Sequence, residues 1–219
     1  MPPLSADPEF RATTFVVIDF EATTPAGHSP EPIEVAAVAL RFDGTTPREI
    51  GDFEALMCPP AHAPVTRFDT EQTGITPQMV QDQPAAGAVL AQLDHLLTAP
   101  PYLLVAHNAS VEGNLIYAQR GACPVLAHTH LIDTVKLSRR LQPDLPSHSL
   151  DWLLSHFGIA RPPDRHRAMA DVRVTVAVLA RLLALADQRG DPHDLTGLMT
   201  VAGYTAKATK PVQETIFDV

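Results

Sequence analysis

The order of apolar and polar residues predicts three strands in the N-terminal quarter of the chain. Residues 15–21 form an apolar, mostly β-branched run that is typical of a buried strand. A second apolar run covers residues 33–40, and a third strand is expected at about residues 49–57, after a turn signal at residues 43–44. Because only short links join these runs, the pattern predicts an antiparallel meander.

The rest of the chain alternates between helical and strand patterns. Residues 59–84 are expected to be loop, with one helical turn after Pro77. Ser110 is a suitable N-cap for the helix that follows the fourth strand. The expected elements are strands at 102–106 and 130–133 and helices at about 85–98, 110–121, 134–141, 149–157 and 167–188.

Length and composition indicate one soluble domain. The chain has 219 residues, of which 45% are hydrophobic, and this is enough for a single sizeable core. No signal-like segment or run of 18 apolar residues occurs, so we expect a cytoplasmic protein with no membrane partner. Cys58 and Cys123 fit no metal or redox spacing and are expected to be free thiols. The net charge of −9 argues against binding a polyanion by bulk attraction.

Four carboxylates stand at positions where they need a partner. Asp19 and Glu21 end the first strand and point from the same face, because strand side chains alternate. Two anions this close require a cation or a proton between them. Glu112 lies at the start of the helix after the fourth strand, and Asp171 lies on the inward stripe of the last long helix.

A histidine accompanies the last of these acids. His166 precedes Asp171 by five residues, which is about 140° around a helix, so both face one site only if His166 lies in the loop before the helix. The prolines at 162–163 favour this interpretation. Clustered carboxylates bind Mg²⁺ or Mn²⁺, and two such ions about 4 Å apart promote phosphoryl displacement. Histidine can take a proton from the attacking water, so the set implies phosphodiester hydrolysis.

Each of these residues also has a simpler interpretation. Asp19 and Glu21 could mark a strand end that reaches water, and an acid such as Glu112 in the first turn of a helix complements the helix dipole. Asp171 could pair with Arg167 or Arg173, and His166 could be an ordinary loop histidine. A zinc site is disfavoured, because the spacing of the histidines fits no standard cluster.

Three segments together resemble a known family. Residues 19–21 (DFE), 107–112 (HNASVE) and 166–171 (HRAMAD) resemble the three exonuclease motifs of the DEDDh (DnaQ-like) 3′–5′ exonucleases. Residues 73–76 (TGIT) and 133–137 (DTVKL) resemble supporting segments of the same family. The similarity spans roughly residues 14–186, in the family's order and spacing.

The resemblance implies an α/β, RNase H-like fold with a mixed five-stranded sheet and helices on both faces. It implies two Mg²⁺ or Mn²⁺ ions and release of nucleoside 5′-monophosphates from the 3′ end of single-stranded DNA or RNA. By the same resemblance, the metal-holding residues are Asp19, Glu21, Glu112 and Asp171. His166 is the general base, and the expected substrate-binding residues are Ala22, Thr23, His107 and Asn108, the last two also bracing their turn.

Two departures from the family pattern leave alternatives open. The family usually has aspartate where this chain has Glu112, and the extra methylene shifts the carboxylate by about 1.5 Å. The alternative function is therefore a catalytically weak or inactive nucleic-acid-binding or scaffold module of the same fold. The first motif is closer to the Eri-1-like RNA exonucleases, a slight lean toward RNA.

The sequence also suggests a domain layout and a basic surface. We expect a flexible lead-in at residues 1–13, the exonuclease domain at 14–188 and a tail at 189–219 of unknown role, which leaves open a DNA polymerase or another replication or repair protein as partner. Residues 136–173 contain seven cationic and four acidic side chains. We expect this basic patch to steer a phosphate backbone. The cations are Lys136, Arg139, Arg140, Arg161, Arg165, Arg167 and Arg173.

Overall fold

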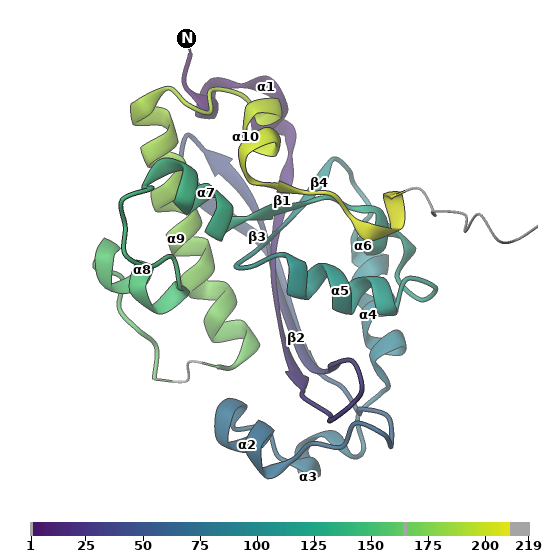
Figure 1. Cartoon of the computed structure of the whole chain (residues 1–219). Coiled ribbons are helices and arrows are strands. Elements are labelled where there is room, and N and C mark those ends of the chain that lie inside the picture. Colours follow the sequence, from purple (N-terminus) through teal and green to yellow (C-terminus); the bar gives the residue numbers. More distant parts are fainter. Residues whose placement is uncertain (1, 164–165, 211–219) are drawn as a thin grey trace, which may run out of the picture.

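A six-stranded mixed sheet forms the centre of the molecule in the computed structural model, which describes residues 2–163 and 166–210 (Figure 1). The strands lie in the order β3-β2-β1-β4-β5-β6. β1–β2, β2–β3 and β5–β6 are antiparallel pairs, while β1–β4 and β4–β5 are parallel. The strands are β1 (Thr14–Thr23), β2 (Glu31–Asp43), β3 (Thr46–Leu56), β4 (Tyr102–Ala106), β5 (Leu131–Asp133) and β6 (Gly203–Tyr204). The expected meander is confirmed, and the sheet has one strand more than predicted.

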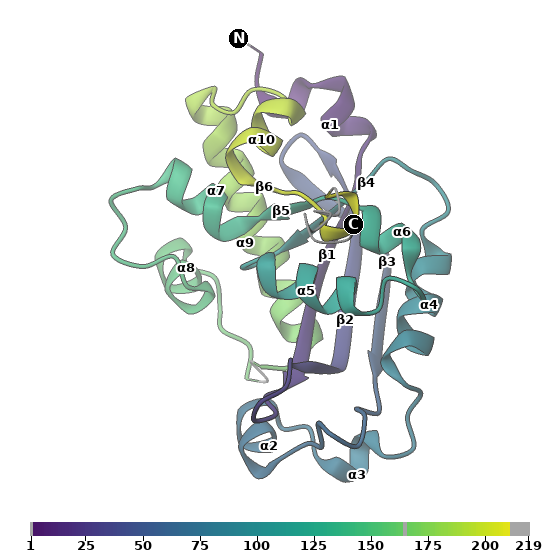
Figure 2. The same cartoon turned by 45° about the vertical axis from the view of Figure 1, so that its right-hand side comes forward.

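Helices cover both faces of this sheet, as predicted. α7, α8 and α9 lie against one face, and α4, α5 and α6 lie against the other (Figures 1 and 2). The helices are α1 (Pro8–Ala12), α2 (Arg67–Thr73), α3 (Pro77–Val80), α4 (Ala86–Leu96), α5 (Ser110–Ala118), α6 (Pro124–His128), α7 (Thr134–Leu141), α8 (Leu150–Phe157), α9 (Ala168–Arg189) and α10 (Leu195–Ala202). Two 3₁₀ turns, Leu4–Ala6 and Lys207–Thr209, complete the described secondary structure.

Alternation along β1 divides its side chains between two apolar cores. Phe15 and Val17 pack in the core under α9, while Val16 and Ile18 pack in the core under α4 and α5. This alternation directs the next odd-numbered side chain, Asp19, to the α9 side of the sheet. The fold of β1 therefore decides which helix can share a site with its carboxylates.

The N-terminal segment, expected to be a flexible lead-in, is helical and packed. Phe10 is fully buried, with its ring centroid 5.1 Å from that of Phe15 and 5.6 Å from that of Phe42. Asp7 caps α1 and also accepts the N–H of Leu195 at 2.7 Å. The prediction was wrong because the packing of Phe10 depends on contacts with distant residues, which the periodicity of the local sequence does not reveal.

Several short elements also differ from the sequence predictions. α2 occupies a segment that was assigned to loop, α6 lies within residues 122–129, for which no element was predicted, and β6 comes from the segment that was assigned to the tail. The N-cap of α5 is Ala109, so Ser110 is the first residue of that helix and does not cap it. The single helical turn after Pro77 is confirmed as α3. In the described part of the chain, no helix combines the length and the apolar character needed to cross a bilayer.

Candidate active site

Three of the four predicted carboxylates converge where β1 meets the start of α9. Asp19 and Glu21 come from β1, and Asp171 comes from the first turn of α9. One oxygen from each carboxylate lies within 4.8 Å of the others. Asp171 is 8% exposed and the other two are half-buried. Three negative charges at this separation repel one another unless a cation or protons lie among them, and hard oxygen donors are the ligands that Mg²⁺ and Mn²⁺ prefer.

A buried ion pair holds the start of α9 against the sheet. Glu34 in β2 is opposite Glu21 in β1, and its side chain is 1% exposed. The Nε of Arg167 donates to both carboxylate oxygens of Glu34 at 3.1 Å, and the N–H of Ala168 donates to Oε2 at 2.9 Å. The two arginines that were considered as partners of Asp171 form ion pairs with other acids: Arg167 pairs with Glu34 and Arg173 pairs with Glu49.

We expect the Arg167→Met variant to lose about 3 kcal/mol of unfolding free energy. The substitution leaves Glu34 buried without its cation, and breaking a buried pair in this way costs about 3–5 kcal/mol; the partial exposure of Arg167 argues for the lower end. Urea denaturation measures the change. The control is Arg173→Met, whose pair with Glu49 is exposed on both sides and should cost less than about 1 kcal/mol. Equal losses in the two variants would contradict this assignment.

His166 lies outside the helix, as the spacing predicted. α9 begins at Ala168, and His166 stands two residues earlier, exposed and with a positive φ of 70°. Such a backbone conformation is uncommon for a residue with a side chain and occurs often at functional sites. The Glu34–Arg167 pair fixes the adjacent residue, so one end of the His166 loop is anchored at the carboxylate cluster.

Glu112 stands apart from the other three acids. It lies in the first turn of α5, and the group of potential metal ligands found among the described residues contains Asp19, Glu21 and Asp171 without it. Glu112 is 4% exposed, and its Oε2 has no hydrogen-bond partner within the part of the chain that the structure describes. Burial, with a smaller contribution from the negative charge of Asp133, raises the pKa of Glu112 to about 8, although a backbone hydrogen bond acts in the opposite direction.

Because the carboxyl of Glu112 is buried, we expect the free energy of unfolding of the metal-free protein in EDTA to depend on pH. Its pKa is about 8 in the folded chain, against an ordinary value of 4.5. Its favourable contribution is therefore complete below pH 4.5 and is lost as the pH rises through about 8. Glu112→Gln removes this titration, so we expect the variant to exceed wild type by on the order of 3 kcal/mol at about pH 8.5 and by much less at about pH 5. Denaturant titrations at both pH values test this, and a pH-independent difference would contradict it.

The segment after Glu21 contains an irregularity in the pairing of β1 with β2. The β1–β2 register shifts between Glu21 and Ala22. Thr23 is fully buried, and its Oγ1 donates to the carbonyl of Glu31 at 3.4 Å. Of the two predicted substrate-binding residues here, Ala22 is half-buried and Thr23 is fully buried.

Asp69 ties α2 to this segment, and sequence reasoning missed it. Its Oδ1 accepts the N–H and the hydroxyl of Thr24, and its Oδ2 accepts those of Thr66. Burial acts to raise its pKa, but these hydrogen bonds outweigh burial and the pKa of Asp69 lies below its ordinary value. The available signal was a capping box over residues 66–69, which marks the start of a helix.

The turn at residues 107–110 connects β4 to α5. His107 Nδ1 lies 2.8 Å from the hydroxyl of Thr134, which donates to the carbonyl of Ala106 at 3.3 Å. Asn108 is exposed, has a φ of 77° and accepts a hydrogen bond from Ser110 Oγ. The structure thus places His107 against α7 and leaves the side chain of Asn108 at the surface.

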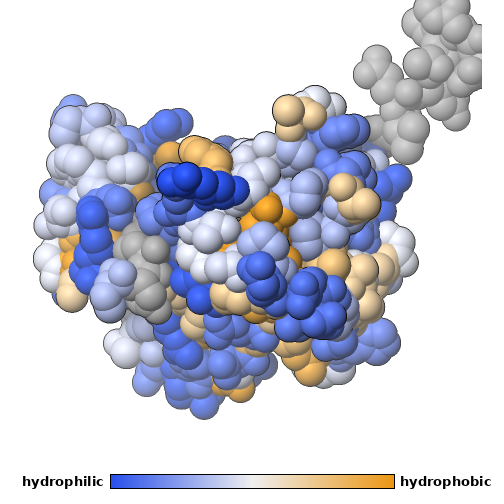
Figure 3. Space-filling view, turned by 90° about the horizontal axis from the view of Figure 1, so that it is seen from below, coloured by the Kyte–Doolittle hydropathy of each residue, from blue (hydrophilic) through white to orange (hydrophobic). Residues whose placement is uncertain are grey.

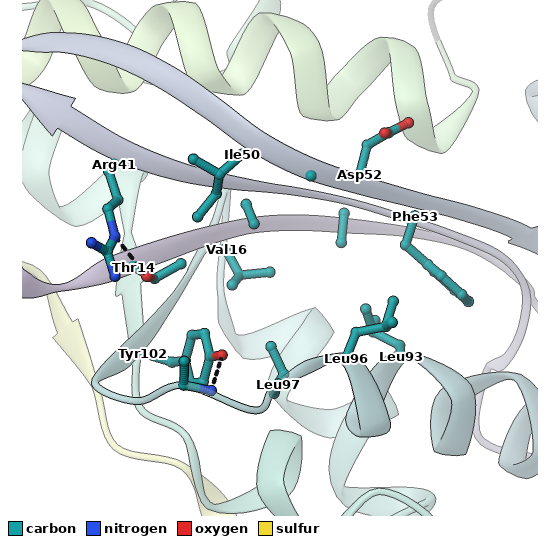
Figure 4. Close-up of a pocket in the computed structure, with 14 residues that line it drawn as sticks. Thr14, Val16, Arg41, Ile50, Asp52, Phe53, Leu93, Leu96, Leu97 and Tyr102 are labelled. Carbon is teal, nitrogen blue, oxygen red and sulfur yellow. Dashed lines mark hydrogen bonds between the residues drawn. The ribbon is translucent and has the colours of Figure 1, made fainter.

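The end of the molecule where β1 finishes is mostly hydrophilic, with apolar side chains near its middle (Figure 3). A separate hollow of about 330 Å³ lies between β3 and the end of α4, lined mainly by apolar residues that include Val16, Phe53 and Leu93 (Figure 4). Arg41 in this hollow donates to Thr14 Oγ1 at 3.4 Å, and the carboxylate of Asp52 points away from the cavity. The carboxylate cluster lies elsewhere, so this hollow is not its substrate pocket.

Comparison with known proteins gives matches over most of the chain. The RNase T family model, described as exonuclease, matches residues 16–179. The chain is 34% identical over 179 residues to the PolC-type DNA polymerase III of Bacillus subtilis, and 31% identical over 169 residues to that of Caldanaerobacter subterraneus. These alignments cover 81% and 77% of the chain but only 12% and 11% of the polymerases. The chain therefore corresponds to a small part of these relatives.

Solved exonucleases have the same fold. The nuclease domain of 3′hExo, a DEDDh family member solved with rAMP, has a TM-score of 0.67 and 23% identity, over 84% of this chain and 96% of that one. Exonuclease X, solved with 5′ overhanging duplex DNA, has a TM-score of 0.58 and 26% identity, over 78% and 91% of the two chains. The architecture is thus that of the DnaQ-like exonucleases.

Proposed function

The chain belongs to the RNase T exonuclease family, and from that premise we propose that it is a metal-dependent 3′–5′ exonuclease of the DEDDh type. It would hydrolyse single-stranded DNA or RNA from the 3′ end and release nucleoside 5′-monophosphates. The observation that carries this proposal is the convergence of Asp19, Glu21 and Asp171, whose carboxylate oxygens lie within 4.8 Å of one another.

The donor set fits two Mg²⁺ or Mn²⁺ ions. Asp19, Glu21 and Asp171 would hold them directly, and Glu112 would help from the start of α5 once it is ionised. When bound, the ions would neutralise the charge that develops on the attacking and leaving oxygens of the phosphodiester. Rigid elements carry all four acids, so their positions are set before the substrate arrives.

His166 is the proposed general base. It is exposed in the loop that begins α9, beside the residue that Glu34 anchors. Histidine side chains exchange protons near neutral pH, so His166 can take the proton from the attacking water. Its loop position lets it approach the site without belonging to the carboxylate cluster.

Four further residues are proposed to bind the terminal nucleotides. Ala22 and Thr23 follow the two acids of β1, and the full burial of Thr23 leaves Ala22 as the more accessible of the two. His107 and Asn108 lie in the turn that leads to Glu112. The relatives are DNA polymerases, which favours DNA as substrate and a polymerase as partner, against the slight lean toward RNA from the first motif.

The alternative of an inactive binding module rests on Glu112, which lies outside the three-carboxylate group. Replacing Glu112 with aspartate, the family's usual residue, discriminates between the two functions. A large gain over an inert wild type would favour the binding module, whereas brisk turnover by wild type would exclude it.

The proposed reaction is tested by identifying the products. DNA and RNA oligonucleotides of one sequence are incubated with Mn²⁺, and the products are separated by chromatography. We expect nucleoside 5′-monophosphates, and the ratio of the two rates selects the substrate class. Release of 3′-monophosphates or internal fragments would contradict the proposal.

A further inference from the structure

A polar hollow of about 910 Å³ is lined in part by His107 and Asn108, two of the proposed substrate-binding residues. Its lining comes from the turn before α5, the start of α7 and the segment that leads into α8. The residues that matter for its chemistry are Asn108, Asp133, Lys136, Arg139, Ser147 and His148.

The sheet places this hollow at the same edge as the carboxylate cluster. β1, β4 and β5 are adjacent parallel strands, with Val17 opposite Val105 and Ala106 opposite Asp133. Val17 is the last residue of β1 that pairs with β4, and Asp19 lies two residues beyond it. The lining of the hollow includes Asp133, the last residue of β5, and the turn that follows Ala106, the last residue of β4. Ligands of open α/β sheets commonly bind outside the carboxyl ends of such strands.

Most cations of the predicted basic patch are already paired with carboxylates, and the described cations that are not so paired line this hollow. Four of the seven cations in the patch bond carboxylates: Arg140 with Asp191, Arg161 with Asp151, Arg167 with Glu34, and Arg173 with Glu49. Arg165 lies outside the described residues. Lys136 and Arg139 both line the hollow and are exposed.

The two remaining cations face the hollow without a carboxylate partner among residues 2–163 and 166–210. Lys136 Nζ donates to the carbonyl of Gly203 at 3.0 Å and lies 5.5 Å from the ring of Tyr204, another lining residue. The one carboxylate of the lining, Asp133, is 5% exposed and accepts the N–H groups of Val135 and Lys136 at the start of α7. The hollow therefore offers two cations to a ligand, while its carboxylate is already engaged by the helix.

Polar donors complete the lining. Ser147 and Asn108 also line the hollow, and His148 Nδ1 lies 2.8 Å from Ser138 Oγ. Burial, and then the positive charge of Arg139, lower the pKa of His148, which places the guanidinium of Arg139 within electrostatic reach of that ring. A lining that combines cations with hydroxyl and amide groups matches the repeating phosphates and sugars of a single strand.

We infer that this hollow binds the sugar–phosphate backbone of the nucleotides upstream of the scissile bond, with Arg139 and Lys136 contacting their phosphates. The inference rests on the proposed exonuclease function and names the part of the chain that recognises substrate length. A dinucleotide offers little backbone to this hollow, whereas an octanucleotide can occupy it.

The test compares kcat/KM for a dinucleotide and an octanucleotide in Mn²⁺. Wild type should prefer the octanucleotide, and Arg139→Gln should reduce this preference about tenfold, as expected for the loss of one charge-assisted contact. The slope of log Kd for the octanucleotide against the logarithm of the salt concentration should be smaller in this variant by about 0.7. The matched control is Arg140→Gln, one residue along α7, whose side chain pairs with Asp191; its length preference and salt slope should equal those of wild type.

An unchanged preference in Arg139→Gln, or an equal loss in Arg140→Gln, would overturn the inference while leaving the proposed function intact. If wild type cleaves neither substrate, the proposed function fails, and binding decides the inference separately. Fluorescence anisotropy of a labelled octanucleotide in EDTA should then show about tenfold weaker binding for Arg139→Gln. Equal affinities of wild type and Arg139→Gln would reject the hollow as a backbone site.

Discussion

The Asp19→Asn variant is expected to shorten single-stranded oligonucleotides about 10⁴-fold more slowly than wild type. The change keeps the size of the side chain but removes one of three negative charges whose oxygens lie within 4.8 Å. Weaker metal binding then removes several kcal/mol of charge stabilisation in the transition state, and each 1.4 kcal/mol is about tenfold in rate. Initial rates on a 5′-labelled oligonucleotide at saturating Mn²⁺ measure the loss.

A carboxylate outside the cluster provides the control for this variant. Asp52 on β3 is exposed, so Asp52→Asn makes the same chemical change without touching the site and should retain wild-type rates. Asp19→Asn should also keep the far-ultraviolet circular dichroism of wild type, because its side chain is only half-buried. A rate within tenfold of wild type would mean that the cluster does not carry the reaction.

The His166→Ala variant is expected to lose about 10³-fold in kcat with a much smaller change in KM. Proton transfer by a positioned general base contributes about 10²–10⁴-fold, and His166 lies two residues before α9, beside the anchored Arg167. The acid limb of the pH–rate profile should disappear with the imidazole. Steady-state kinetics from about pH 5.5 to 9 measure both effects.

His95 gives the matched histidine control. It is exposed on α4, and its Nδ1 lies 2.5 Å from the carbonyl of Ala91 in its own helix. His95→Ala should therefore leave kcat and the pH profile unchanged. If His166→Ala kept its acid limb and lost less than about tenfold in kcat, another group would have to accept the proton.

The central elements of the site follow from short-range patterns in the sequence. Alternation along β1 predicts that Asp19 and Glu21 share a face, and the structure has both in one cluster. The helical period predicts that Asp171 lies on an inward stripe, and it is buried at the start of α9. The prolines at 162–163 predict that His166 lies before the helix, which α9 confirms by beginning at Ala168.

The parts that sequence patterns could not supply depend on long-range contacts. Glu34 and Arg167 are separated by 133 residues, and the pattern of β2 does not indicate that its one buried acid would anchor α9. The motif places Glu112 with the other acids, but it has no information on burial or on the distance between α5 and α9. The charge count in the basic patch likewise omits the partners Asp191 and Glu49, which come from distant segments.

The most direct test of the account is the cleavage of a 5′-labelled single-stranded oligonucleotide by wild type with Mn²⁺ and with EDTA. The account predicts a ladder of products that shortens from the 3′ end in Mn²⁺ and no products in EDTA. Cleavage that continues in EDTA, or products that arise only from internal breaks, would contradict a metal-dependent 3′–5′ exonuclease built on Asp19, Glu21 and Asp171.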